Sequence, residues 1–255
     1  FLVYKMISNS MRAKIVEVDI NKKKDASFMT INLDLIKDSI SSKTKVIFIA
    51  NPSNPTGTII DAKKLKKFLK SISKKIIVVI DEAYIEYACY KGHTSALDLI
   101  KDFKNIVITR SFSKIYAIAG SRVGYGISQT SIIQKLNSMR QPFNVNKIAQ
   151  IMAIKSLQDK KYLRDSLKVN KKCYEYITQE LDKDSIKYID SYTNFVTIYF
   201  GKDTSVIFEG LLKKGIILRP LNNYGLPNYL RVTIGTMNEC KTFIKNLRVL
   251  LKRIR

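Results

Sequence analysis

Short apolar runs rich in β-branched residues alternate with helical patterns along the first half of the chain. Runs of this kind predict strands when turn residues bound them, whereas apolar positions spaced by three and four residues predict amphipathic helices. The order strand, helix, strand, helix predicts an α/β fold with a mostly parallel sheet and helices on both faces. Strands are expected at residues 14–18, 46–50, 76–80 and 106–109, and helices at residues 33–40, 63–71 and 96–101.

The second half continues with longer helical patterns and then with a separate group of strands. A proline and two asparagines at residues 141–146 favour a turn before a new helix start. We expect a large domain at residues 1–162 and a smaller C-terminal α/β domain at residues 163–255. The remaining strands are expected at residues 123–127, 195–200, 215–218 and 229–234, and the remaining helices at residues 132–139, 147–157, 163–181, 206–213 and 239–251.

The chain is strongly basic. It carries 45 Lys and Arg residues against 21 Asp and Glu residues, so its formal net charge is 45 − 21 = +24. This balance raises nucleic acid as a partner. However, the lysines stand in short clusters on polar helix faces and loops, without aromatic residues at regular intervals to stack bases. We therefore favour solvated faces, with an acidic partner as the alternative. Phosphate-bearing small substrates would be attracted by the same field.

Cysteine, histidine and hydropathy argue against several kinds of site. Cys89, Cys173 and Cys240 lie far apart and match neither a metal nor a disulfide spacing, so we expect reduced, structural cysteines. His93 is the single histidine, so the chain has few residues that could form a zinc site or a histidine-based catalytic triad. We therefore expect no bound metal. No apolar run has the length of a membrane span and the first residues lack a signal-peptide layout, so we expect a soluble, cytoplasmic protein.

Three of the expected parallel strands end in polar or reactive residues. Residues 51–57 follow the second strand, residues 81–84 the third and residues 111–114 the fourth. Ligands of open parallel sheets collect outside the carboxyl ends of the strands. The topology therefore predicts that these three segments meet at one site.

Lys114 is the candidate nucleophile of this site. It is flanked by Ser111 and Ser113, and Arg122 follows eight residues later. Two hydroxyls and a guanidinium beside an amine suit a phosphate held next to a nucleophile, which is what a pyridoxal phosphate enzyme needs to form its Schiff base. The tetrapeptide Ser-Phe-Ser-Lys alone favours a solvated turn, so the case for a nucleophile depends on the rest of the chain.

Asp81 and Asn54 stand at the other two strand ends. A carboxylate at the mouth of a buried strand is costly unless it meets a cation or strong donors, and a protonated pyridine nitrogen would be such a partner for Asp81. The alternative for Asp81 is a helix N-cap. Two prolines and a glycine stiffen residues 51–57, so that Asn54 can be aimed with little remaining entropy to lose, although this segment alone also fits a turn-rich connection.

Five segments in this order carry a resemblance to a known family. They are Asn-Pro-Ser-Asn-Pro-Thr-Gly at residues 51–57, Asp-Glu-Ala-Tyr-Ile-Glu-Tyr at residues 81–87, Arg-Ser-Phe-Ser-Lys with Ala-Gly-Ser-Arg-Val-Gly-Tyr at residues 110–114 and 119–125, Gln-Pro-Phe-Asn-Val-Asn at residues 141–146, and Leu-Arg-Val-Thr-Ile-Gly-Thr at residues 230–236. The chain resembles the pyridoxal phosphate aminotransferases of fold type I, and most of all the histidinol-phosphate aminotransferases. It corresponds to the later part of a family member, so we expect the family's N-terminal part to be missing. Residues 22–24 look like a surface insertion.

The resemblance implies a role for each residue around the cofactor ring. Lys114 would form the Schiff base with pyridoxal 5'-phosphate, and Asp81 would pair with the pyridine nitrogen. Asn54 and Tyr84 would donate to the 3-hydroxyl oxygen of the ring, and Phe1 would stack on its face.

The resemblance also implies how the anionic groups are held. Ser111, Ser113 and Arg122 would bind the phosphate of the cofactor. Arg231 matches the arginine that grips the anionic end of the substrate, and Arg219 matches a second arginine used for the substrate phosphate. Arginine suits both tasks because its planar fork matches the oxygens of carboxylates and phosphates.

The implied activity is a ping-pong transamination in histidine biosynthesis. A homodimer would interconvert L-histidinol phosphate and 2-oxoglutarate with imidazole acetol phosphate and L-glutamate, and Lys114 would move the proton. Another fold type I enzyme, such as a threonine-phosphate decarboxylase or an aromatic aminotransferase, is the nearest alternative. A basic nucleic-acid-binding protein is the alternative from a different class, and only the charge favours it.

Overall fold

The computed structural model describes residues 1–20, 28–201 and 204–254. These residues form two compact units: Phe1–Asn54 with Thr58–Lys160, and Pro55–Gly57 with Lys161–Arg255. The insertion expected at residues 22–24 lies outside the described residues. Among the described residues, the helices lack the combination of length and apolar character needed to cross a lipid bilayer.

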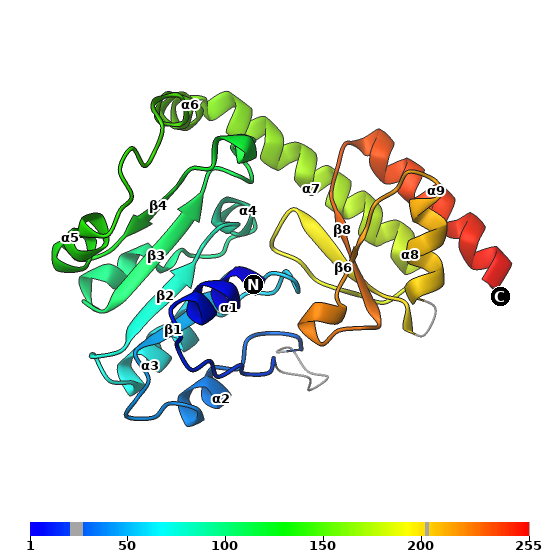
Figure 1. Ribbon diagram of the computed structural model, residues 1–255. Helices are drawn as coiled ribbons and strands as arrows, with labels where there is room; N and C mark the ends of the chain where they lie inside the picture. The colour runs from blue at the N-terminus through cyan, green and yellow to red at the C-terminus, as the bar shows by residue number, and fades with distance from the viewer. Residues whose placement is uncertain (21–27, 202–203, 255) are drawn as a thin grey trace. The chain divides into compact units, whose positions relative to one another are not determined.

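The first unit is built on a four-stranded sheet in the order β1 (Val46–Ala50), β2 (Ile77–Asp81), β3 (Ile106–Ser111) and β4 (Gly124–Ile127). The strands β1, β2 and β3 are parallel, and β4 runs antiparallel beside β3 (Figure 1). The prediction of a mostly parallel sheet is therefore confirmed, with an antiparallel edge strand.

The sheet buries one face almost completely. Leu65, Phe68 and Leu69 of α3 (Ala62–Ser71) follow helical spacing and pack against this face, where Val78 and Ile80 of β2 are fully buried. Asp61 starts α3 by accepting hydrogen bonds from the backbone N–H groups of Lys63 and Lys64. The other face is covered less completely, and Ile77 and Val79 of β2 stay half-buried there.

Further helices belong to the first unit. They are α1 (Leu2–Ser10), α2 (Leu33–Asp38), α4 (Ile85–Tyr90), α5 (Thr130–Ser138), α6 (Lys147–Gln158) and the 3-10 helices η1 (Ala96–Lys101) and η2 (Ala119–Ser121). The helix α1 lies on the face of the sheet opposite α3, where the Tyr4 ring stacks on Phe48 of β1 (Figure 1). Helices on both faces of the sheet are therefore confirmed.

The strand expected at residues 14–18 is wrong. This segment has no strand partner among the described residues, and the only pairing near it is an isolated bridge between Ile20 and Ile31. Val16 is more than half exposed. A β-branched pattern makes a strand only where a neighbouring strand can complete its hydrogen bonds, and none lies beside this segment.

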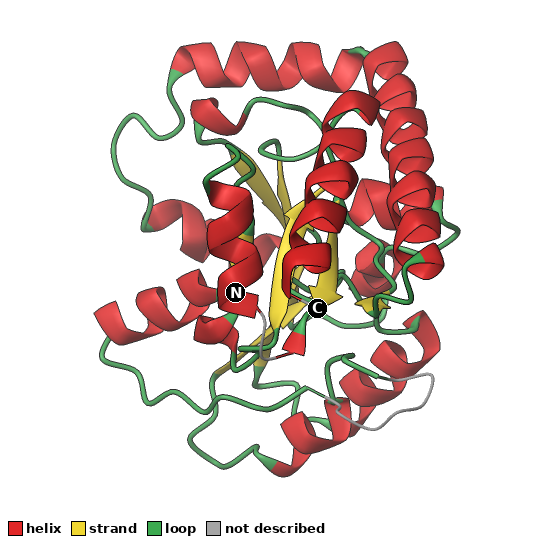
Figure 2. Ribbon diagram, turned by 90° about the vertical axis from the view of Figure 1, so that its right-hand side faces the viewer, coloured by secondary structure: helices red, strands yellow, loops and turns green. Residues whose placement is uncertain are grey.

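The second unit is a separate α/β arrangement. Its sheet has the order β5 (Tyr188–Ile189), β6 (Phe195–Tyr199), β8 (Tyr229–Thr233) and β7 (Arg219–Pro220), with antiparallel neighbours throughout. The apolar sides of three helices, α7 (Lys160–Lys183), α8 (Thr204–Leu212) and α9 (Met237–Ile254), form one core with this sheet. Figure 2 draws these strands in yellow and these helices in red.

The strand expected at residues 215–218 is also wrong. These residues carry the chain out of α8: Gly215 has a positive φ of 74°, and the N–H of Ile216 donates to the carbonyl of Leu211. This is a helix C-terminus that favours glycine. Pairing with β8 begins only at Arg219. Of the three free cysteines, Cys173 and Cys240 are buried and Cys89 is exposed.

Candidate active site

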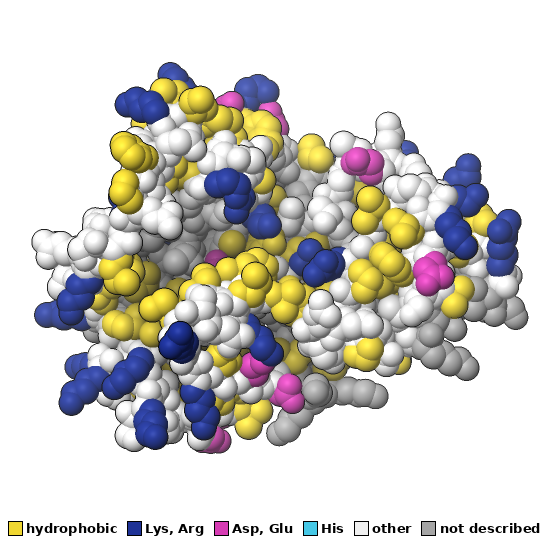
Figure 3. Space-filling model, viewed as in Figure 1, with side chains coloured by type: hydrophobic (Ala, Val, Ile, Leu, Met, Phe, Trp, Pro, Cys, Tyr) yellow, Lys and Arg dark blue, Asp and Glu magenta, His cyan; other side chains and the backbone are white. Residues whose placement is uncertain are grey.

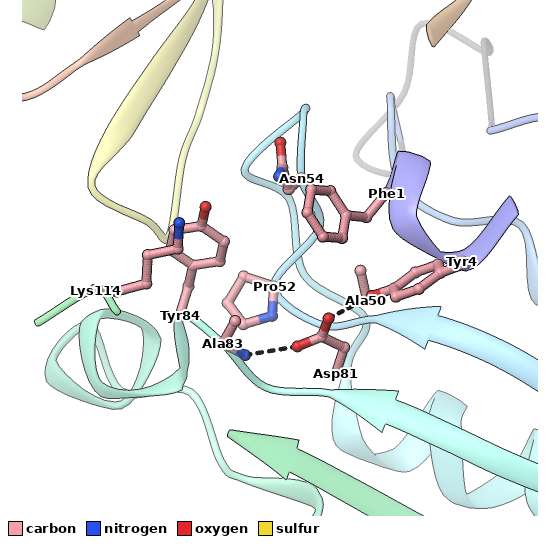
Figure 4. Close-up of a pocket in the computed structure, with 9 residues that line it drawn as sticks. All are labelled: Phe1, Tyr4, Ala50, Pro52, Asn54, Asp81, Ala83, Tyr84 and Lys114. Atoms are coloured by element: carbon pink, nitrogen blue, oxygen red, sulfur yellow. Dashed lines mark hydrogen bonds between the residues drawn. The ribbon is translucent and has the colours of Figure 1, made fainter. Parts of the chain in front are cut away.

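A pocket in the first unit opens at the carboxyl ends of β1 and β2 and beside the loop that follows β3. Its cavity volume is about 50 Å³. Five of the predicted site residues line it, namely Phe1, Asn54, Asp81, Tyr84 and Lys114 (Figure 4). Tyr4, Ala50, Pro52 and Ala83 complete the lining.

Asp81 ends β2 and is positioned by the sheet. Its backbone is the register partner of Ala50 on β1 and of Thr109 on β3. Its carboxylate accepts two hydrogen bonds, one at Oδ1 from the backbone N–H of Ala83 at 3.0 Å and one at Oδ2 from the Tyr4 hydroxyl at 2.5 Å. The helix that follows begins with Tyr84 at its N-cap position. Asp81 is therefore not the cap of that helix, and its carboxylate faces the pocket.

The loop that carries Asn54 is closed at its base. The N–H of Ser53 donates to the carbonyl of Thr58 at 2.8 Å, and the buried side chain of Asn51 accepts from the N–H of Ile60 at 2.8 Å. The Asn51–Pro52 peptide is cis. These bonds make the connection after β1 a fixed turn, from which Asn54 reaches the pocket.

Residues 55–57 of the same loop belong to the second unit. The Thr197 hydroxyl donates to the carbonyl of Pro55 at 2.6 Å, and the N–H of Tyr192 donates to the carbonyl of Gly57 at 2.8 Å. Gly57 has a φ of 81°, and a Cβ at this position would lie 2.3 Å from the Ser191 hydroxyl oxygen. Glycine is required there by both the backbone conformation and the close approach.

Lys114 projects from a tight passage after β3. The side chains of Phe112 and Ile115 are buried on either side of it, and the N–H of Ala117 donates to the Lys114 carbonyl. The Lys114 Nζ lies 5.2 Å from the centre of the Tyr84 ring. The buried neighbours anchor the backbone, so the amine is presented to the pocket from a defined position.

The three residues expected to hold a phosphate are not among those that line the pocket. Ser111 accepts a hydrogen bond from the N–H of Ser113 at 3.0 Å, which shapes the turn before Lys114. Arg122 is exposed, has a φ of 51°, and donates from its guanidinium to the carbonyl of Ala119. These three residues are close to Lys114 in the sequence but do not line the pocket. That they bind the phosphate of the cofactor stays a prediction.

A buried ion pair ties the ends of β2 and β3 together. Glu82 is 1% exposed, and its Oε2 accepts from the Arg110 guanidinium at 2.8 Å. Ser95 and the N–H of Ala96 also donate to this carboxylate. Because Glu82 follows Asp81 and Arg110 precedes Ser111, the pair fixes the distance between the two chain segments that form the pocket.

The sequence reasoning missed this pair and Tyr4. For Glu82 and Arg110 a signal existed: each stands next to a candidate residue, at adjacent parallel strand ends. For Tyr4 the sequence held no such signal, because its contact with Asp81 depends on the packing of α1 against the sheet.

Two titratable groups near the Lys114 loop have shifted pKa values. Burial raises the pKa of Glu86 from 4.5 to about 6, against the effect of Arg110. Burial, with the charge of Glu86 as the next cause, raises the pKa of Tyr116 to about 12. At neutral pH a partly buried carboxylate therefore lies beside a phenol that stays protonated.

The two candidate substrate arginines occupy paired positions on neighbouring strands of the second unit. Arg219 of β7 and Arg231 of β8 are register partners in the antiparallel pair. The Arg231 guanidinium carbon lies 4.8 Å from the centre of the Phe195 ring. Like charges directly across two strands disfavour each other, so an anion bound by both would stabilise this arrangement.

No group of three or more His, Cys, Asp and Glu residues that could hold a metal ion occurs within residues 1–20, 28–201 and 204–254. The pocket brings together an amine, a carboxylate, an amide and a phenol, from Lys114, Asp81, Asn54 and Tyr84. The family model for class I and II aminotransferases matches residues 1–247. The chain belongs to the class I and II aminotransferase family.

Curated relatives of this aminotransferase chain support the assignment. It is 40% identical over 250 residues to histidinol-phosphate aminotransferase 1 of Idiomarina loihiensis, covering 98% of the chain and 66% of that protein. It is 41% identical over 222 residues to a histidinol-phosphate aminotransferase of Caldicellulosiruptor saccharolyticus, covering 87% of the chain and 62% of that protein. The chain therefore spans less than two thirds of the length of these relatives.

Solved structures share its fold. The histidinol-phosphate aminotransferase of Clostridium acetobutylicum superposes with a TM-score of 0.90 at 28% identity, covering 98% of the chain and 75% of that structure. The enzyme of Sinorhizobium meliloti, solved in complex with pyridoxal-5'-phosphate, superposes with a TM-score of 0.87 at 24% identity, covering 100% of the chain and 69% of that structure. The fold type I architecture expected from the sequence is confirmed.

Proposed function

We propose that the complete protein is a pyridoxal phosphate-dependent aminotransferase acting on L-histidinol phosphate and 2-oxoglutarate in histidine biosynthesis. The observation that carries the proposal is the convergence of Lys114, Asp81, Asn54 and Tyr84 on one pocket, in a chain about 40% identical to histidinol-phosphate aminotransferases.

The side chains in the pocket fit this cofactor. Asp81 presents a carboxylate whose orientation is set by two donors, which suits a protonated ring nitrogen. Asn54 and Tyr84 supply an amide and a phenol for the 3-hydroxyl oxygen, and Phe1 offers an aromatic face. When bound, pyridoxal phosphate supplies an aldehyde that condenses with amines and a ring that withdraws electrons from the adjacent carbon. Ser111, Ser113 and Arg122 are our candidates for its phosphate.

Lys114 performs the proton transfer in this proposal. Of the residues that line the pocket, it alone carries a side-chain amine. In each half-reaction its Nζ would move one proton between the substrate carbon that bears the amine and the cofactor carbon that carries the aldehyde. The nitrogen must be uncharged for this task, and a cationic ring held by Asp81 would favour its uncharged form.

Arg219 and Arg231 set the substrate class. Both amino donors of the reaction are anionic, because L-histidinol phosphate carries a phosphate and glutamate a side-chain carboxylate. Arg219 and Arg231 occupy paired positions on β7 and β8, and guanidinium groups suit such anions. In this proposal Arg231 grips the anionic end of either donor, and Arg219 adds contacts to the phosphate.

A screen of amino donors against the cofactor-loaded complete protein tests the proposal. The absorbance change of the bound cofactor measures each half-reaction, with L-histidinol phosphate, glutamate, O-phosphothreonine and phenylalanine as donors. We expect L-histidinol phosphate to react fastest. Carbon dioxide release from O-phosphothreonine would support the decarboxylase alternative, and faster reaction of phenylalanine would support an aromatic aminotransferase. No reaction with any donor would contradict the proposal.

We also propose that the protein is a homodimer. Ile148, Ile151 and Ile154 lie three residues apart on α6 and are 72%, 49% and 55% exposed. An exposed apolar stripe of this kind marks an interaction surface, and a second copy of the chain is the partner that the family resemblance implies. Sedimentation of the complete protein should give the mass of a dimer, and Ile151→Glu should shift it towards the monomer.

A further inference from the structure

One side chain in the pocket has no role in the proposed reaction, although it contacts a residue that does. Tyr4 of α1 lines the pocket, and its hydroxyl donates to Asp81 Oδ2 at 2.5 Å (Figure 4). The backbone N–H of Ala83 donates to Oδ1 at 3.0 Å. Within the part of the chain that the structure describes, Oδ1 accepts from a backbone N–H group and Oδ2 accepts from a side chain.

The Tyr4 ring is itself held in place by aromatic packing. It stacks on Phe48 with ring centres 4.9 Å apart and planes 13° apart, and it meets the edge of Phe1 at 5.8 Å. Phe48 belongs to β1, the strand on which Ala50 is the register partner of Asp81. The pairing of β1 with β2 therefore positions both the residue that holds the Tyr4 ring and the Asp81 carboxylate. The hydroxyl is a preorganised donor, so little side-chain entropy remains to be lost when it holds the carboxylate.

We propose that Tyr4 is a positioning residue that orients the Asp81 carboxylate towards the ring nitrogen of the cofactor. The Tyr4 hydroxyl would fix the plane of the Asp81 carboxylate. A carboxylate oxygen would then keep a lone pair available for the ring nitrogen of the cofactor. The inference rests on the proposed function, since it gives Tyr4 an effect on the cofactor only through Asp81. The loss of the Tyr4 hydroxyl should therefore weaken the binding of a ligand that has the ring nitrogen. It should hardly change the binding of a ligand that lacks this nitrogen.

The test compares two ligands on the cofactor-free complete protein. One is pyridoxal phosphate, and the other is its analogue in which a C–H group replaces the ring nitrogen. Dissociation constants are measured by equilibrium dialysis for the wild type and for Tyr4→Phe, which keeps the ring that stacks on Phe48. We expect Tyr4→Phe to weaken pyridoxal phosphate about 10-fold, the size of one hydrogen bond to a charged group. The analogue should change by less than about twofold, within the scatter of a neutral substitution.

Three further variants make the test specific. Tyr4→His retains a donor and should restore the preference for pyridoxal phosphate over the analogue. Asp81→Asn should abolish that preference. Tyr90→Phe removes a hydroxyl from a tyrosine that does not line the pocket, and it should leave both constants unchanged.

The outcomes separate this inference from the proposed function. If the wild type fails to bind pyridoxal phosphate, or binds both ligands equally, the role of Asp81 and the proposed function fail together. If the wild type discriminates and Tyr4→Phe keeps the full preference, or weakens both ligands equally, only the inference about Tyr4 is overturned. Selective weakening of pyridoxal phosphate with rescue by Tyr4→His supports it.

Discussion

At the scale of single residues, Glu86 shows how burial near the active-site loop makes stability depend on pH. Its pKa is raised from 4.5 to about 6, chiefly by burial. A raised carboxyl pKa means that the fold favours the protonated form. Its contribution to stability is therefore complete below pH 4.5 and is lost as the pH rises through about 6.

Replacing Glu86 by glutamine should remove this dependence. The difference between 4.5 and about 6 corresponds to about 2 kcal/mol. We expect the free energy of unfolding of Glu86→Gln, relative to the wild type, to rise by up to that amount between pH 4.5 and pH 7.5. Urea unfolding at several pH values measures it. Parallel profiles for the two proteins would show that Glu86 is not responsible.

The candidate residues at the strand ends were easier to predict from the sequence than the residues that contact them. Asp81, Asn54 and Lys114 stand at the ends of apolar strands, and the topology alone brings them to one pocket. Tyr4 comes from a helix whose position no local pattern indicates. The directions in which Arg122 and Arg219 point depend on turns and side-chain rotamers, which a pattern of residue types does not specify.

At the scale of elements, the Glu82–Arg110 pair joins β2 to β3 beneath the pocket. The Glu82 side chain is 1% exposed and that of Arg110 17% exposed. Removing one partner of a buried pair leaves an uncompensated charge, which costs about 3–5 kcal/mol. We expect Arg110→Met to destabilise the protein by about this amount in urea unfolding.

An exposed ion pair serves as the control for Arg110→Met. Lys66 and Asp102 contact each other at 2.6 Å, but their side chains are 44% and 49% exposed. Solvent screens such a pair, so Lys66→Met should cost less than about 1 kcal/mol. Equal losses for the two variants would contradict the view that the buried pair ties the strands.

Elements with strong periodicity were predicted well, and elements defined by their neighbours were not. The helices α3 and α9 and the strands β1, β6 and β8 follow their hydrophobic patterns closely. The direction of β4 is set by its pairing with β3, not by its own residues. Residues 14–18 have strand composition but no partner strand, and residues 215–218 serve to end a helix. Tertiary pairing overrides local propensity at these positions.

At the scale of the whole molecule, the net charge of +24 is spread over many elements. On the face drawn in Figure 3, Lys and Arg side chains of the described residues stand in separate groups over both units. A distributed positive field accelerates the approach of anionic substrates and is screened by salt.

This charge predicts a salt dependence that separates catalysis from nucleic-acid binding. For the complete protein, kcat/KM for L-histidinol phosphate should fall several-fold as salt rises from 0.02 to 0.3 M, while kcat stays nearly constant. The measurement is steady-state kinetics with a neutral salt. Tight, steeply salt-dependent binding of duplex DNA, with no salt effect on kcat/KM, would instead favour the nucleic-acid alternative.

The central claim is that Lys114 is the amine that reacts with the cofactor, and chemical labelling tests it most directly. The complete protein, loaded with pyridoxal phosphate, is reduced with borohydride, digested and mapped by mass spectrometry. We predict a single modified peptide with the label on Lys114, and Lys114→Ala should carry no label. Stoichiometric labelling of any other lysine, or no labelling of the wild type, would contradict the account.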